Sequence, residues 1–184
     1  GEMNRARRMY HSGETTDLDF VVEQFGTRFP DRPLYLAGYS LGANVIGKWL
    51  GERAESCPEF VRAAAIVSAP YDLVASGPFV DSGIRRQIHG LRDREDYYSQ
   101  PPCGQFLERI RRPIMLLSAA DDPFNPGFTL PRALADESPY LHPQFTEHGG
   151  HVGFVHRHRN TPQTFWAEFQ IAQFFNTYRS LFEE

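Results

Sequence analysis

The sequence predicts an α/β fold in which a mostly parallel sheet is flanked by helices. Short, almost uninterrupted apolar runs alternate along the chain with longer segments in which apolar residues recur at every third or fourth position. Uninterrupted runs are typical of strands buried on both faces, and their alternation with helices is typical of parallel sheets. The 184 residues suit one domain with its own hydrophobic core, so we expect a single domain over residues 1–184.

The first half of the chain contains two helices and two strands. Helical spacing over residues 15–29 predicts a helix that Pro30 ends. A short apolar run at residues 33–39 predicts a buried strand. Helical spacing returns over residues 41–54, and a second buried strand is expected at residues 61–70, which end in proline.

The second half begins with an irregular region, residues 71–102, which contains Gly, Pro and a charged patch. We expect this region to be an insert. The elements that follow are expected as a short helix, a buried strand, a short helix, a weaker strand and a long amphipathic helix, at residues 104–110, 112–120, 129–137, 142–148 and 161–184. About four strands are therefore predicted.

Composition excludes several classes of protein. The net charge is −4 and no basic stripe is present, so we expect no nucleic-acid partner. No apolar run approaches the roughly 18 residues that a membrane span needs. Two cysteines lie outside any paired motif, Cys57 and Cys103, which favours free thiols in a reducing compartment. No apolar leader is visible in the sequence, so we expect a cytoplasmic location.

The stretch "LYLAGYSLGANVIG" contains a G-x-S-x-G pattern centred on Ser40. The pattern alone is weak, but it lies between a predicted strand and a predicted helix, where a nucleophile elbow belongs. Gly38 and Gly42 are expected to leave room for a sharp turn, because glycine has no Cβ. The N–H of Leu41 would then point at a developing oxyanion. Ser40 is therefore a candidate nucleophile; the alternative is an ordinary glycine-rich turn with a capping serine.

A serine nucleophile needs a base and an acid that orients the base, and in a fold with such an elbow they follow in the order acid, then His. The third predicted strand runs into Asp121 and Asp122, and the fourth runs into "EHGGHVGF". We favour Asp122 as the acid because "DPFNP" resembles the turn that follows such acids, with Asp121 as the alternative. His151 is favoured as the base over His148, because two glycines before it allow a close approach to Ser40.

A metal site is the rival explanation for the histidines. The segment "HGGHVGFVHRH" contains His148, His151, His156 and His158. It lacks an H-E-x-x-H helix, and no cysteine joins the cluster. We therefore expect no metal and no cofactor.

Five segments together resemble a known family. "RMYHSGET", "GYSLGAN", "IHGLRDREDYY", "DDPFNP" and "EHGGHVGF" occur in the order found in the YheT-like, or embryogenesis-associated, branch of the α/β-hydrolases. The resemblance covers most of the chain and implies the C-terminal portion of that fold. It also implies a triad of Ser40, Asp122 and His151 that acts on carboxylic esters or lipid-like acyl groups.

The chain departs from this family in two respects. It begins near the end of the family's upstream half, which supplies early strands and a second oxyanion donor, so one side of residues 33–39 should be unpaired. An upstream segment, a second subunit or a rearrangement is expected to cover that edge. The segment from Asp72 to His89 is also shorter than the family's cap. The resemblance therefore implies either a reduced cap within residues 71–102 or residues absent from this chain.

These observations favour a serine esterase whose partner is a small-molecule ester. Two alternatives follow from the same residues. The chain could be a truncated or degenerate hydrolase that self-associates without turnover, or an acyltransferase that uses the same triad.

Overall fold

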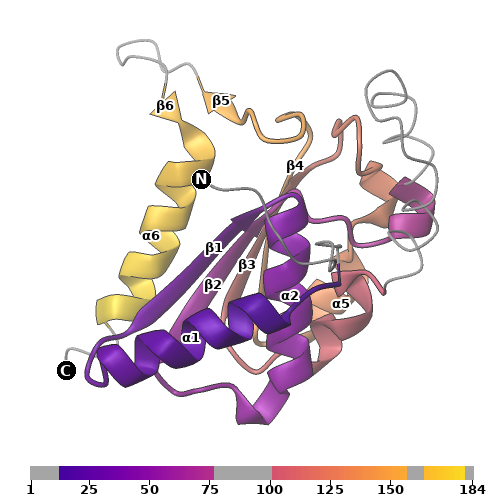
Figure 1. Ribbon diagram of the computed structural model, residues 1–184. Helices are drawn as coiled ribbons and strands as arrows, with labels where there is room; N and C mark the ends of the chain where they lie inside the picture. The colour runs from indigo at the N-terminus through magenta and orange to yellow at the C-terminus, as the bar shows by residue number, and fades with distance from the viewer. Residues whose placement is uncertain (1–12, 77–100, 157–163, 181–184) are drawn as a thin grey trace, which may run out of the picture.

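The computed structural model describes residues 13–76, 101–156 and 164–180. Its main sheet has four parallel strands in the order β1-β2-β3-β4 (Figure 1). The strands are β1 (Leu34–Tyr39), β2 (Val61–Val67), β3 (Ile114–Ala119) and β4 (Leu141–Thr146). The predicted α/β class, with four strands in a parallel sheet, is therefore confirmed.

Helices cover both faces of this sheet. They are α1 (Thr16–Arg28), α2 (Leu41–Arg53), α5 (Arg132–Glu137) and α6 (Trp166–Ser180), with 3₁₀ turns η1 (Ala54–Ser56), η2 (Cys103–Arg109) and η3 (Gly127–Thr129). Residues of α1, α2, η2 and α5 pack into one hydrophobic cluster with the sheet, whereas α6 packs into a second cluster on the other face. In Figure 1 the strands run between α6 on one side and α2 on the other.

The strand β3 explains why the sequence shows uninterrupted apolar runs. Ile114 and Leu116 belong to the cluster beneath α2, and Met115 and Leu117 belong to the cluster beneath α6. All four side chains are fully buried. Burying each one contributes roughly 1.5–3 kcal/mol. Because neighbouring side chains on a strand point to opposite faces, both faces must be apolar when both are covered.

The last helix begins later than the sequence predicts. It starts at Trp166 rather than residue 161, because two residues before it form a strand instead. The strand β6 (Thr164–Phe165) pairs antiparallel with β5 (Val155–His156), which the sequence analysis did not foresee. Residues 161–163 and 181–184 of the predicted helix lie outside the described residues.

The expected cap or insert, residues 71–102, falls mostly on residues 77–100, which lie outside the described part of the chain. The described ends of this region join the core. Tyr71 and Leu73 are buried after β2, and the η2 turn packs against α2 through Cys103 and Leu107.

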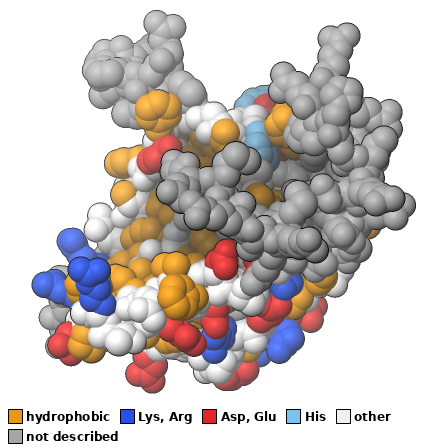
Figure 2. Space-filling model, viewed as in Figure 1, with side chains coloured by type: hydrophobic (Ala, Val, Ile, Leu, Met, Phe, Trp, Pro, Cys, Tyr) orange, Lys and Arg blue, Asp and Glu red, His pale blue; other side chains and the backbone are white. Residues whose placement is uncertain are grey.

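The strand β1 forms one edge of the sheet. Among the described residues it pairs only with β2. Apolar side chains are exposed on helices of both faces: Phe20 and Val21 on α1 are about 60% exposed, and Phe169 on α6 is 55% exposed. Figure 2 shows hydrophobic side chains gathered on the face where β1 and α1 lie in Figure 1. An apolar strand with an open edge is prone to pair with another strand.

Two further expectations concern membranes and thiols. None of the helices in the described ranges is long and apolar enough to cross a membrane. Cys57 and Cys103 are free and buried. Burial raises the pKa of both thiols, to about 12 at Cys103, which favours their protonated form in the folded chain.

Candidate active site

Ser40 occupies the sharp turn between β1 and α2. Its backbone has φ +51° and ψ −115°, a conformation that residues with a side chain rarely adopt. The turn is held on both sides: the Ser40 N–H donates to the Val67 carbonyl of β2 at 2.8 Å, and the Ser40 carbonyl accepts the Asn44 N–H at 3.1 Å. This strained turn presents the hydroxyl at the carboxyl end of the sheet.

The two glycines of the motif differ in what they contribute. A Cβ at Gly38 would lie 2.6 Å from the Gly42 carbonyl oxygen and 2.8 Å from Ile46 Cδ1, so this position requires glycine. A Cβ at Gly42 would meet no heavy atom within 4 Å. The expectation of crowding is therefore right for Gly38 and wrong for Gly42, whose own position lies on the open side of the turn.

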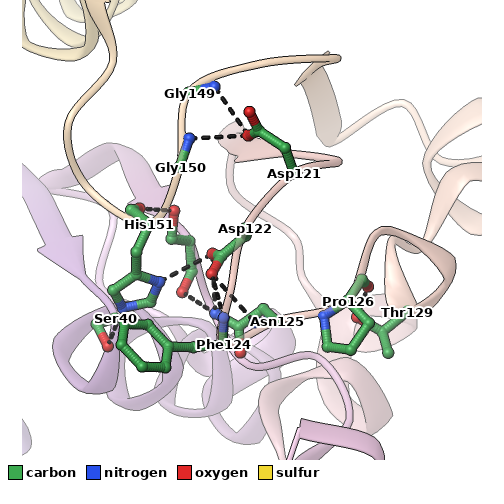
Figure 3. Close-up of polar contacts among 11 residues, drawn as sticks. Ser40, Asp121, Asp122, Phe124, Asn125, Pro126, Thr129, Gly149, Gly150 and His151 are labelled. Atoms are coloured by element: carbon green, nitrogen blue, oxygen red, sulfur yellow. Dashed lines mark hydrogen bonds and ion pairs between the residues drawn. The ribbon is translucent and has the colours of Figure 1, made fainter. Parts of the chain in front are cut away.

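The structure brings together the three residues that the sequence singled out. His151 Nε2 lies 2.8 Å from Ser40 Oγ, and His151 Nδ1 lies 2.8 Å from Asp122 Oδ2 (Figure 3). A carboxylate oxygen only accepts, so Nδ1–H donates to Asp122 and Nε2 is left to accept the Ser40 hydroxyl. Ser40 follows β1, Asp122 follows β3 and His151 follows β4, so the contacts reach across the sheet.

Asp122 is held by donors on both oxygens. Oδ1 accepts the backbone N–H groups of Phe124 at 2.8 Å and Asn125 at 3.1 Å. Oδ2 accepts Asn125 Nδ2 at 3.3 Å in addition to the imidazole. The Asp122 side chain is fully buried, whereas that of His151 is 18% exposed. A buried carboxylate surrounded only by donors is suited to orient an imidazole and to stabilise its protonated form.

The imidazole is also restrained by its neighbours. The Phe124 ring meets it edge to face, with centroids 4.9 Å apart and planes at 82°. The His151 carbonyl accepts a hydrogen bond from Ser68 Oγ. The ring is therefore held by packing against Phe124, and the backbone that carries it is held by the hydrogen bond from Ser68.

The two alternatives in the sequence analysis lie elsewhere. Asp121 bonds to the backbone N–H groups of Gly149 and Gly150, at 2.9 and 2.8 Å, rather than to the His151 ring. His148 is 89% exposed, and its Nδ1 lies 3.2 Å from Asp121 Oδ2. Within the described part of the chain, the Ser40 hydroxyl bonds to His151 and to neither of these residues.

Two buried polar residues near the triad escaped the sequence analysis. Ser68 follows β2 with φ +52° and is fully buried, and Asn125 is 4% exposed. Asn125 Nδ2 donates to the Ser68 carbonyl at 2.9 Å and to Asp122, which links the ends of β2 and β3. The position of Asn125 in the turn after Asp122 was a usable signal, because Asn often bonds to nearby backbone groups. Nothing in the sequence distinguishes Ser68 from other serines at strand ends.

Leu41 is the first residue of α2. The first N–H groups of a helix lack partners within the helix and carry its positive end, so the Leu41 N–H is suited to stabilise an anion beside Ser40. Among the described residues no group of three or more His, Cys, Asp or Glu side chains could hold a metal ion. His158 lies outside those residues.

Comparison with known proteins identifies relatives of the same kind. No family model matches the sequence. The putative esterase YheT of Escherichia coli is 31% identical over 225 aligned residues, which cover 97% of this chain and 65% of that protein. Monoacylglycerol lipase of Saccharomyces cerevisiae is 26% identical, over 79% of this chain and 43% of the lipase. The solved Pyrococcus furiosus esterase Pf2001 superposes with a TM-score of 0.67 at 16% identity, over 90% of this chain and 62% of that one.

The chain belongs to the α/β-hydrolase superfamily. This α/β-hydrolase spans less than two thirds of YheT and less than half of the yeast lipase. The alignment with YheT covers 225 positions, more than the 184 residues of this chain, so the E. coli protein has residues within the aligned region that this α/β-hydrolase lacks.

Proposed function

We propose that the chain is a serine hydrolase that cleaves carboxylic esters through Ser40, His151 and Asp122. The observation that carries the proposal is the pair of 2.8 Å contacts made by the two nitrogens of the His151 ring, one to each of the other residues. Relatives named as an esterase and a lipase support the same reaction class.

The proposed reaction has two stages. Ser40 Oγ attacks the acyl carbon while His151 Nε2 takes the hydroxyl proton, and the Leu41 N–H stabilises the oxyanion. His151 then gives the proton to the leaving alcohol, which leaves an acyl group on Ser40. Water repeats the attack: His151 takes a proton from it, and that proton returns to Ser40 as the acid departs. Asp122 stabilises the imidazolium in both stages.

We infer that the acyl groups are apolar. Val152, next to the proposed base, is 48% exposed, and the Phe124 ring packs on the imidazole. The names of the yeast lipase and of mouse phospholipase ABHD3 agree with an acyl ester of a lipid. A series of p-nitrophenyl esters from acetate to decanoate tests this inference. The ratio kcat/KM should rise with chain length up to a limit; a maximum at acetate would contradict it.

A fluorophosphonate probe tests the reaction itself, because it phosphonylates an activated serine without needing turnover. The wild-type chain should be labelled once per molecule, and Ser40→Ala should not be labelled. Ser56→Ala is a matched control, since Ser56 lies in an exposed turn at the far end of α2, and it should label as the wild type does. Failure to label the wild type, or labelling of Ser40→Ala, would refute the proposal.

A second candidate function is that of an activated serine with slow turnover. Of the described residues, only Leu41 has been assigned as an oxyanion donor. Loss of one such donor typically lowers kcat by about 10²- to 10³-fold. Stoichiometric labelling together with ester turnover slower by that factor than in esterases of similar fold would support this reading, and rapid turnover would exclude it.

A further inference from the structure

The loop that carries His151 is held by a carboxylate outside the proposed triad. Asp121 Oδ1 accepts two consecutive backbone N–H groups, from Gly149 at 2.9 Å and Gly150 at 2.8 Å (Figure 3). Asp121 Oδ2 faces His148. The hydrogen bond from the Gly150 N–H is the main cause that lowers the pKa of Asp121, so this group is a carboxylate at neutral pH.

The loop needs such an anchor because its two glycines contribute no side-chain packing. A Cβ at Gly149 would lie 2.5 Å from a ring carbon of Phe154, and Gly150 has φ +62°. Gly149 therefore requires glycine and the positive φ at Gly150 favours it, which leaves the backbone N–H groups as the groups that can be held. The Phe154 N–H donates to the Gly149 carbonyl at 3.1 Å, which closes the loop on its other side.

We propose that Asp121 is a positioning residue: it fixes the backbone of the loop at Gly149 and Gly150 while Asp122 fixes the His151 ring. This inference rests on the proposed function. Asp121 and Asp122 are joined by one peptide unit, which sets their Cα atoms about 3.8 Å apart. The carboxylate that holds the loop backbone and the carboxylate that holds the ring therefore stay at a nearly constant separation. This keeps the His151 imidazole within hydrogen-bond distance of Ser40.

Three variants separate this role from a general effect on folding. Asp121→Ala removes both backbone anchors. Asp121→Asn keeps an acceptor oxygen for the two N–H groups, and its NH₂ can donate to His148 Nδ1. His148→Ala removes only the exposed partner of Asp121 and serves as the matched control. The Asp121 side chain is 42% exposed, so none of the three should prevent folding.

The measurements are the fluorophosphonate labelling rate, kcat and KM for an ester, and the melting temperature. A displacement of about 1 Å can cost about 10²-fold in rate, so Asp121→Ala should lower the labelling rate and kcat by roughly 10- to 100-fold with KM changed less than about twofold. Asp121→Asn should stay within about threefold of the wild type, and His148→Ala within about twofold. Wild-type rates in Asp121→Ala would overturn the inference, as would an equal loss in Asp121→Asn.

Amide hydrogen exchange provides a readout that does not depend on activity. Exchange at Gly149 and Gly150 should be faster in Asp121→Ala than in the wild type, and it should be unchanged in the sheet. Unchanged exchange at both glycines would overturn the anchoring. If the wild type is not labelled by the probe, the proposed function fails, while the exchange result still decides whether Asp121 holds the loop.

Discussion

Replacement of Asp122 by Asn has a consequence that follows from its four hydrogen bonds. Oδ1 accepts two backbone N–H groups, so the amide oxygen of the new side chain must occupy that site. The NH₂ group then takes the place of Oδ2, where it donates to His151 Nδ1. The ring proton moves to Nε2, which faces Ser40 Oγ at 2.8 Å, and the imidazole can no longer accept the hydroxyl proton.

The expected loss is large in rate and modest in stability. Reversal of the imidazole tautomer in a Ser-His-Asp triad costs about 10⁴-fold in kcat, or roughly 5.5 kcal/mol of transition-state stabilisation. The new NH₂ would also face the Asn125 NH₂, which lies 3.3 Å from Oδ2. Two buried donors in opposition cost about 1–3 kcal/mol in the free energy of unfolding.

The assay pairs the rate of fluorophosphonate labelling with thermal unfolding of the same sample. Asp122→Asn should be folded at 25 °C and labelled about 10⁴-fold more slowly than the wild type. Asp121→Asn, one residue away, is the control and should keep its rate. A loss of less than tenfold in Asp122→Asn would refute the reasoning. A loss of about 10⁴-fold in Asp121→Asn instead would assign the acid to Asp121.

Two further predictions concern backbone conformation. Gly38→Ala should lower the free energy of unfolding in urea by about 1–3 kcal/mol because its Cβ would overlap the Gly42 carbonyl, whereas Gly42→Ala should leave it unchanged or higher. Equal stability of the two variants would contradict this account of the turn. Ser68→Gly should keep stability within about 1 kcal/mol, because relief at φ +52° offsets the lost hydrogen bond to the His151 carbonyl, yet it should lower kcat about tenfold. Unchanged kcat would show that this bond is dispensable.

The sheet could be predicted because strands buried on both faces leave a clear trace in the sequence. The runs that became β2 and β3 are apolar at nearly every buried position, and Pro70 and Pro113 lie at the end of the first run and the start of the second. The short strands β5 and β6 left no such trace, since two residues cannot display a period. Their pairing moved the start of the last helix to Trp166.

The three residues of the proposed triad could be predicted because their order along the chain, each after a strand, is visible in the sequence. A serine after one strand, an acid after a later strand and a histidine after the next form an ordered set, and the structure brings those three side chains into contact. The supporting groups were less accessible. Ser68 depends on a positive φ that nothing in its neighbours requires, and the open side of Gly42 depends on how the turn lies against the rest of the fold.

The order of the strands also sets a length requirement. His151 follows β4, and its carbonyl accepts a hydrogen bond from Ser68, which follows β2. The segment before His151 therefore crosses two interstrand spacings of about 4.8 Å, roughly 10 Å in all, and the imidazole reaches on to Ser40. The five residues from 147 to 151 can span at most about 17 Å when fully extended. Removing one of them would shorten the reach by about 3.5 Å, more than the whole distance between His151 Nε2 and Ser40 Oγ. We therefore expect a deletion within residues 147–151 to be tolerated less well than the substitution of most side chains in that segment.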